Sequence, residues 1–375
     1  MKPLFSVPDR GYGPAPWWAW MGDPTPDRMD RQLRRFLDMR VFEVIIIPLY
    51  GLVPEYLGTR YFELYRHACR RCRQWKIKLW IYDEFNWPSG TCAGRVLRDF
   101  PEARQQLIQF SWPGSAYGGG APTWRVAPYG GFDLASYGAS WALATTGYVD
   151  VLSAPAVRRF IGLTMERYRE ELGGYFGDVI VGFFTDEPAI SHGGPQFPYT
   201  PGLFGQFKAR YGYDLEPRVT DLVVDSPGAL KVRRDYWALV NGLFQHNFFR
   251  QYAGWCARHG LKMTGHLLLE ELLSSNIRYS GNLPADLAEM QVPGMDLLQG
   301  ATSFDTQGPL FVGEKGLADI GCRLLDSAAC FSGRQRTLCE AFGCVPYSST
   351  ARFYKRATDF LMHHGLSMIN DNLFV

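Results

Sequence analysis

Val44-Ile45-Ile46-Ile47 is a run of four apolar, β-branched residues that lies between Glu43 and Pro48. Leu79-Trp80-Ile81-Tyr82 and Val179-Ile180-Val181-Gly182-Phe183-Phe184 repeat this pattern further along the chain. A strand with one face in water alternates apolar and polar residues, whereas a strand covered on both faces is apolar throughout. These runs therefore predict strands of a parallel sheet that is covered on both faces.

Amphipathic helices are predicted between these strands. Thr25-Pro26-Asp27 combines an N-cap residue, a proline at the first turn and an acidic residue, and apolar residues follow it at helical spacing. Near the C-terminus, the apolar spacing from Phe353 to Leu361 predicts another helix, which Gly365 ends. Alternating strands and helices are typical of α/β folds.

Eight segments carry the strand pattern: Pro16–Trp20, Glu43–Pro48, Lys78–Glu84, Val179–Glu187, Lys262–Leu269, Met295–Gln299, Arg336–Glu340 and Leu366–Asn372. Eight βα units predict a single (β/α)8 TIM barrel over residues 1–375, and no glycine-rich phosphate loop follows the first strand as in a dinucleotide-binding fold. Residues 106–153 are rich in Gly, aromatic, Ser and Thr residues without helical spacing, which predicts a small β-rich insertion after the third strand. Only residues 373–375 follow the last strand, so the usual closing helix is not predicted.

Composition and charge exclude several classes of function. The chain has 39 Lys and Arg against 37 Asp and Glu, and a net charge of +2 gives no basic footprint for nucleic acid. No apolar run approaches the roughly 18 residues of a membrane span. Met1–Arg10 lacks the apolar stretch of a secretory signal, and eight cysteines are too few for a disulfide scaffold. We therefore expect a cytoplasmic protein that binds neither nucleic acid nor membranes.

Acidic residues recur where the predicted strands end. They are Asp83 and Glu84 after the third strand, Asp186 and Glu187 after the fourth, Glu270 (with His266) after the fifth, Glu340 after the seventh and Asp371 after the eighth. The carboxyl ends of the strands meet on one rim of a barrel, where barrel enzymes hold their active sites. The sequence therefore predicts a cleft lined with carboxylates.

Glycoside hydrolysis uses two carboxyl groups that flank the bond, a proton donor with a raised pKa and a base or nucleophile. Glu187 follows an apolar strand and precedes Pro188, so we assign it as the catalytic acid. We assign Glu340 as the second carboxylate, with Glu270 as the alternative. A structural ion pair at the strand end is the other interpretation of each residue.

The other polar and aromatic residues near the strand ends are candidates for binding a sugar. They are Trp17, Trp20, Asp83, Glu84, Trp87, Asp186, His266, Glu270 and Asp371. Most have a structural alternative: the Trp residues as core, Asp186 as a helix cap, His266 as a buried core histidine, and Asp83 and Glu84 as anchors of the turn at 87–90. The sequence predicts no required cofactor, and at most a weakly held calcium ion near Asp83, Glu84 or Glu270.

Four segments together resemble a known family. They are Pro16-Trp17-Trp18-Ala19-Trp20, Tyr82-Asp83-Glu84-Phe85-Asn86-Trp87-Pro88-Ser89-Gly90-Thr91, Phe183-Phe184-Thr185-Asp186-Glu187-Pro188 and Glu340-Ala341-Phe342-Gly343. They look like the catalytic barrel of the α-L-rhamnosidases of glycoside hydrolase family 106. The resemblance implies an inverting, calcium-assisted hydrolase that removes a terminal sugar, most notably α-L-rhamnose, from an oligosaccharide or glycoside.

Two other functions remain open from the sequence. One is a retaining β-glycosidase on the same barrel, with the acid on the fourth strand and a nucleophile on the seventh. The other is a barrel that binds glycans without catalysis, or a fragment that needs a further domain, which the missing closing helix favours. The separation of the two carboxyl groups distinguishes the two enzymes, and an activity screen distinguishes both from the binding protein.

Overall fold

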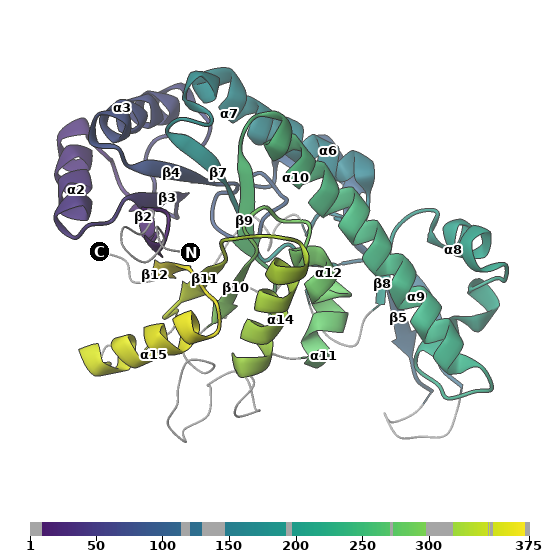
Figure 1. Cartoon of the computed structure of the whole chain (residues 1–375). Helices are drawn as coiled ribbons and strands as arrows, with labels where there is room; N and C mark the ends of the chain where they lie inside the picture. The colour runs from purple at the N-terminus through teal and green to yellow at the C-terminus, as the bar shows by residue number, and fades with distance from the viewer. Residues whose placement is uncertain are drawn as a thin grey trace.

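The computed structural model describes residues 10–113, 121–129, 147–192, 197–270, 273–297, 318–343, 345 and 348–371. Two parallel sheets form its centre (Figure 1). The first has the order β2 (Trp17–Trp20), β3 (Glu43–Pro48), β4 (Lys78–Tyr82), β7 (Ile180–Asp186) and β9 (Lys262–His266). The second has the order β1 (Gly13–Pro14), β12 (Met368–Asp371), β11 (Leu338–Ala341) and β10 (Gly294–Leu297). All eight predicted strands are therefore present, with ends shifted by a few residues.

The apolar runs are explained by burial on both faces. All six residues of β3 are buried. Val44 and Ile46 belong to the large core that includes the helices, whereas Ile45 and Ile47 belong to a second core cluster. Because successive side chains point to opposite faces of a strand, a strand with a core on each side has to be apolar at every position.

The second core cluster joins the two sheets. It contains side chains from both: Trp17, Ile45, Ile47, Trp80, Tyr82 and Phe184 from the first sheet, and Leu338 and Met368 from the second, with Ala15 and Val292 just outside the strands. At one junction the Val292 N–H donates to the Met263 carbonyl oxygen at 3.0 Å, and at the other the Ala15 N–H donates to the Ile369 carbonyl oxygen at 2.8 Å. The sheets therefore face each other across a shared core. The strands nevertheless pair as two separate sheets, so the predicted closed barrel is not confirmed. A mixed α/β fold with parallel sheets is confirmed.

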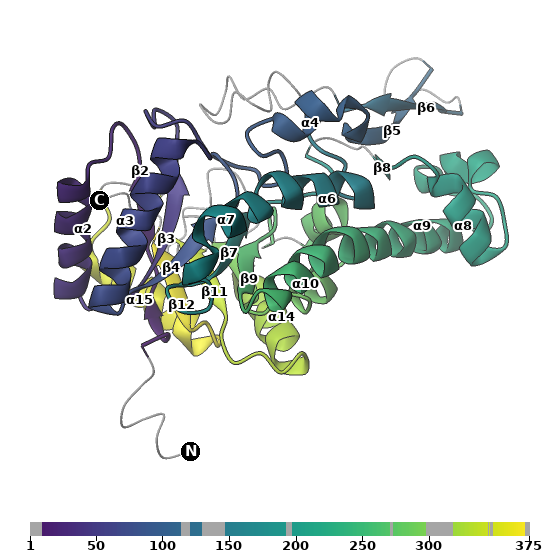
Figure 2. The same ribbon diagram turned by 90° about the horizontal axis from the view of Figure 1, so that it is seen from above.

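Helices follow the strands on the outside of the sheets (Figure 1, Figure 2). They are α2 (Pro26–Asp38), α3 (Thr59–Trp75), α4 (Arg95–Asp99), α6 (Ala154–Leu163), α7 (Met165–Leu172), α10 (Arg250–Arg258), α11 (Leu273–Ser275), α12 (Leu283–Leu287), α14 (Ala318–Phe331) and α15 (Ala351–His363). The predicted start of α2 is confirmed: the Thr25 side chain caps it by accepting from the Arg28 N–H, and Pro26 and Asp27 occupy its first turn.

A group of elements, which we call the arm, projects from the sheets (Figure 1, Figure 2). It contains an antiparallel sheet in the order β6 (Thr123–Pro128), β5 (Gln106–Ser111) and β8 (Phe197–Tyr199), together with α8 (Leu203–Tyr211) and α9 (Ala229–Phe244). Strands β5 and β6 lie within the segment 106–153 that was predicted to be β-rich; residues 114–120 and 130–146 of that segment lie outside the described residues. The third strand and both helices come from the connection after β7.

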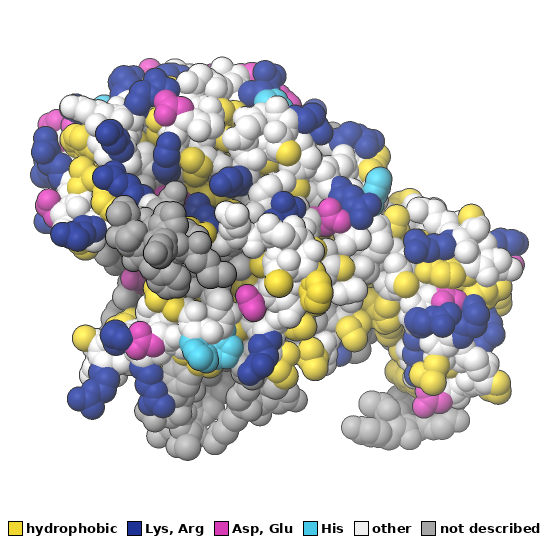
Figure 3. Space-filling view, in the orientation of Figure 1, with side chains coloured by type: hydrophobic (Ala, Val, Ile, Leu, Met, Phe, Trp, Pro, Cys, Tyr) yellow, Lys and Arg dark blue, Asp and Glu magenta, His cyan; other side chains and the backbone are white. Residues whose placement is uncertain are grey.

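Charge is divided between the inside and the outside of the molecule. Eleven Asp and Glu side chains are buried in the described part of the chain, and its buried polar residues include no Lys or Arg. Figure 3 accordingly shows many Lys and Arg and few acidic side chains on the face that it presents. Of the described helices, none is long and apolar enough to cross a bilayer.

Asp150, at the base of the arm, gives a first prediction. Its carboxylate accepts from the Thr200 hydroxyl at 2.6 Å and the Leu152 N–H at 3.0 Å, and burial raises its pKa from 3.8 to about 7. The folded chain therefore holds this proton more tightly than the unfolded chain, so the contribution of Asp150 to stability falls as the pH rises from about 4 to about 7. In the parent chain, Asp150 makes the free energy of unfolding fall from pH 5 to pH 8. In Asp150→Asn this fall should be smaller by roughly 1–3 kcal/mol.

Urea unfolding at the two pH values measures this difference. Asp225→Asn is the matched control, because the side chain of Asp225 is 93% exposed and should leave the pH dependence unchanged. An identical pH dependence in Asp150→Asn and the parent chain would contradict a raised pKa at this position.

Candidate active site

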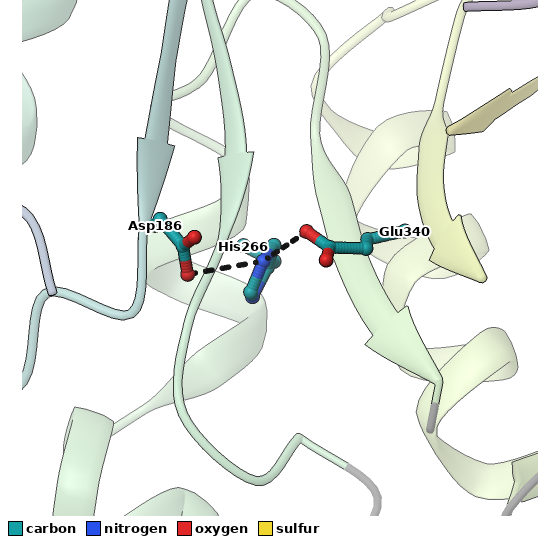
Figure 4. Close-up of side chains that lie close together, drawn as sticks. All are labelled: Asp186, His266 and Glu340. Atoms are coloured by element: carbon teal, nitrogen blue, oxygen red, sulfur yellow. Dashed lines mark hydrogen bonds and ion pairs between the residues drawn. The ribbon is translucent and has the colours of Figure 1, made fainter. Parts of the chain in front are cut away.

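Three strand ends bring Asp186, His266 and Glu340 together. Figure 4 shows the three side chains from β7, β9 and β11 pointing toward one another. Gly265 permits this approach: it has φ +126°, and a Cβ there would lie 1.9 Å from the Thr185 carbonyl oxygen of β7. No other residue fits so close to a neighbouring backbone, so the glycine before His266 sets the spacing of β7 and β9.

His266 is the centre of this group and is 1% exposed. Its Nδ1 lies 3.0 Å from the Leu267 carbonyl oxygen, and its Nε2 lies 3.0 Å from Glu340 Oε2 and 3.4 Å from Asp186 Oδ1. Carbonyl and carboxylate oxygens accept hydrogen bonds, so both ring nitrogens carry a proton in this arrangement. Burial lowers the pKa of His266, but Asp186, Glu340 and Glu270 outweigh it and raise the pKa well above 6.5. The imidazole is therefore a cation among carboxylates.

Glu187 follows Asp186 at the end of β7 and is half-buried. Its backbone has φ 48°, in the left-handed region that side chains other than glycine seldom adopt, and its N–H donates to the His266 carbonyl oxygen at 3.2 Å. Burial raises the pKa of the Glu187 carboxyl well above its ordinary value, and Asp186, Glu270 and Glu340 raise it further against the opposing charge of His266. The strand end thus holds a carboxyl group that stays protonated at a higher pH than an ordinary glutamate.

Glu340 is held in a different environment. Its Oε1 accepts from Trp17 Nε1 at 3.4 Å, and its Oε2 accepts from His266. The Trp17 ring packs edge-on against Tyr82 and Phe184, with centroid distances of 5.5 and 4.7 Å. Both oxygens of Glu340 therefore accept from an N–H donor, one of which is cationic.

Asp186 lies between these two environments. It accepts from the Tyr82 hydroxyl at 2.6 Å, and burial, opposed by His266 and reinforced by Glu340, raises its pKa to about 6. Asp186 is therefore the buried neighbour of Glu187 that both bonds His266 and raises the Glu187 pKa.

Asp296 belongs to the site but was not predicted from the sequence. This residue lies on β10, directly opposite Glu340 of β11, and it is 8% exposed. One ligand atom from each of Glu187, His266 and Asp296 lies within 4.8 Å of the others. A lone acidic residue between Met295 and Leu297 in an apolar strand was the signal that could have identified it.

Asp83 and Glu84 are buried, and protein donors surround them. The two oxygens of Glu84 accept from the backbone N–H groups of Phe85, Thr91, Cys92 and Ala93 and from the Thr91 hydroxyl. Asp83 accepts from the hydroxyls of Ser89 and Tyr252. These contacts support the alternative interpretation of both residues as anchors of the loop that contains Trp87.

Glu84 gives a second prediction. In Glu84→Gln, an amide N–H2 replaces one acceptor oxygen and faces backbone N–H groups that lose their partner, so the free energy of unfolding should fall by about 1–3 kcal/mol. Chemical denaturation at pH 7 measures it. Glu55→Gln is the control, because Glu55 is a surface residue whose side chain is 81% exposed, and it should change stability by less than about 0.5 kcal/mol. Equal stabilities for both variants would contradict the anchoring role.

The structure separates the remaining predicted residues. Trp20 is 2% exposed and packs against Tyr61 and Tyr65 of α3, on the side of β2 away from Trp17. Trp87 is half-buried against the large core. Glu270 is buried, with its Oε1 3.8 Å from His266 Nδ1, which brings it to the edge of the carboxylate group. Asp371, half-buried, ends β12 opposite Ala341, one position beyond Glu340.

The calcium ion that the family resemblance implies would need oxygen ligands at this site. Among the described residues, two groups could hold a metal, Asp186–His266–Glu340 and Glu187–His266–Asp296, and neither contains Asp83, Glu84 or Glu270. Both include a histidine, whereas calcium prefers oxygen ligands, and His266 would have to lose a proton to ligate. The donor set that the structure brings together fits calcium poorly.

The fold of the chain is similar to a solved structure over nearly its whole length. The structure of a rhamnosidase from Novosphingobium sp. PP1Y aligns with a TM-score of 0.70 and 12% sequence identity, over 99% of this chain and 56% of that rhamnosidase. The chain thus spans little more than half the length of that protein, and at this identity the likeness concerns the fold. No protein-family model and no curated protein matches the sequence.

Proposed function

We propose that this chain is the catalytic part of a glycoside hydrolase that removes a terminal sugar from an oligosaccharide or glycoside, with α-L-rhamnose as the first sugar to test. The observation that carries the proposal is the contrast between two carboxyl groups at one rim. Glu187 has a pKa raised by burial and by like charges, while Glu340 accepts from Trp17 and the cationic His266. An acid and a base in neighbouring environments are what glycosidic cleavage needs.

The eight strands support a barrel for this catalytic unit. The shared core between the two sheets and the junctions at Val292 and Ala15 fit a (β/α)8 barrel whose pairing is interrupted at two places. The likeness to the fold of a rhamnosidase, over 99% of this chain, supports the assignment as a glycoside hydrolase. On such a barrel the carboxyl ends of β7 and β11 face a common substrate.

In the proposed reaction, Glu187 donates its proton to the glycosidic oxygen as the bond to the anomeric carbon breaks. Glu340 accepts a proton from a water molecule whose oxygen bonds to that carbon from the opposite side, which inverts the configuration. Trp17 and His266 hold the Glu340 carboxyl group by hydrogen bonds, and Asp186 keeps the pKa of Glu187 high. One proton leaves Glu187 and one reaches Glu340, so the pair is reset by exchange with solvent.

A screen of the purified chain on aryl glycosides tests the function, with aryl α-L-rhamnoside included and with calcium either added or chelated. Hydrolysis of one glycoside that is lost in Glu340→Gln would support the proposal. Binding of a glycan without turnover of any glycoside would replace it with the non-catalytic alternative. A loss of activity on chelation would show that the donor set binds a metal in spite of its histidine.

A further inference from the structure

The hydroxyl of Ser89 connects the ends of two strands. Ser89 Oγ donates to Asp83, directly after β4, and accepts from the Asp186 N–H of β7 at 2.7 Å. The Ser89 N–H donates back to the Asp186 carbonyl oxygen at 2.8 Å. Ser89 and Asp83 are 0% exposed and Asp186 is 5% exposed, so these bonds are made out of contact with water, where a broken one costs most.

Two tyrosine hydroxyls donate hydrogen bonds to Asp83 and Ser89. Tyr252 of α10 donates to the second oxygen of Asp83 at 2.8 Å, and Tyr148 donates to the Ser89 carbonyl oxygen at 2.6 Å. The bonds run from Tyr252 through Asp83 and Ser89 to Asp186, and each hydroxyl in that line donates to one partner. All the hydrogen bonds from Tyr252 to Asp186 are therefore formed at the same time in this structure.

The residue after Asp186 is the one that needs this support. Glu187 has a left-handed backbone, which costs of the order of 1 kcal/mol for a residue with a side chain and persists only where the surroundings enforce it. On one side its N–H bonds the His266 carbonyl oxygen, and on the other Ser89 fixes both backbone groups of the preceding residue. Without the Ser89 hydroxyl, the buried Asp186 N–H would lose this acceptor.

We propose that Ser89, backed by Asp83 and Tyr252, is a positioning residue that fixes the direction of the Glu187 carboxyl group. It touches neither the sugar nor the reacting atoms, and it acts through the backbone of Asp186. The inference rests on the proposed function for its kinetic consequence, and on the hydrogen bonds of the described residues for its structural one.

Ser89→Ala tests this inference. A misplaced acid protonates poor leaving groups inefficiently, so kcat on alkyl glycosides should fall about 10–100-fold, since a displacement of about 1 Å can cost that much. The KM should stay within about twofold, and kcat on activated aryl glycosides should fall less than about threefold. Hydrogen–deuterium exchange followed by mass spectrometry should show faster exchange in the peptide that carries the Asp186 amide.

Tyr252→Phe should give the same pattern with a smaller loss, because Ser89 itself remains. Its matched control is Tyr168→Phe, which removes a buried hydroxyl that pairs with Tyr61 at 2.6 Å in the outer core, and which should leave kcat, KM and the Asp186 peptide unchanged. Equal losses on alkyl and aryl glycosides, a raised KM, or unchanged exchange of the Asp186 peptide in a folded Ser89→Ala would overturn the proposal. If the parent chain hydrolyses no glycoside, the proposed function fails, and the exchange measurement by itself decides whether Ser89 holds the turn.

Discussion

A Glu187→Gln variant is expected to lose at least about 100-fold in kcat on glycosides with poor leaving groups, the usual size of general-acid catalysis. The amide keeps the shape of the side chain but cannot give a proton to the glycosidic oxygen. Activated aryl glycosides should lose far less, because their leaving group departs without protonation. Steady-state kinetics on a series of leaving groups measures the contrast.

The pH profile gives the same assignment independently. Glu187 is active in its protonated form, and its pKa is raised, so activity should persist above the ordinary pKa of a glutamate and fall as the pH rises through the Glu187 pKa. In Glu187→Gln this basic limb should disappear for activated substrates. The surface variant Glu55→Gln should retain the limb and the full rate. A basic limb that survives in Glu187→Gln would assign the acid to another group.

A Glu340→Gln variant is expected to lose about 10³-fold or more on every substrate, activated aryl glycosides included. The reason is that attack on the anomeric carbon is needed whatever the leaving group, and an amide does not accept a proton from water. This uniform loss distinguishes Glu340 from Glu187. It is measured with the same leaving-group series.

Proton NMR of the first-formed sugar decides what Glu340 does. Inversion requires space for a water molecule between the carboxyl groups, about 6.5–9.5 Å, and retention brings them to about 5–5.5 Å. We expect the opposite anomer to that of the substrate. A product that keeps the configuration of the substrate would make Glu340 a nucleophile and would favour the retaining β-glycosidase.

The strands could be predicted from the sequence because burial on both faces leaves a strong pattern. Val44 to Ile47 is the clearest case: the core on each side of β3 requires an apolar residue at every position. The arm could not be predicted in the same way. Its third strand, β8, is only three residues long. It follows β7 in the sequence, whereas its partner β5 precedes β7, and local periodicity does not encode such a distant pairing.

The candidate site was predicted in part, for a comparable reason. Acidic residues that end strands were visible, and Asp186, His266 and Glu340 lie together as that pattern suggested. The direction of a side chain was not visible: Trp17 and Trp20 both lie on β2, and Trp17 reaches Glu340 while Trp20 packs under α3. The role of Ser89 and Tyr252 could not be predicted, because a hydroxyl becomes informative only when its partner across the fold is known.

The long helix that links the arm to the strands has a mechanical consequence. Residues 229–258 run from α9 through a π-helical turn at Gln245–Phe249 into α10 without a break, which at 1.5 Å per residue is roughly 45 Å of continuous backbone. Its far end carries the arm, and its near end carries Tyr252, whose hydroxyl bonds Asp83. A displacement of the arm would therefore reach the Asp83 carboxylate as a small rotation or shift of one continuous helix. At the π-helical turn, the Asn247 side chain donates to the Leu152 carbonyl oxygen at 2.6 Å and ties the helix to the segment before α6.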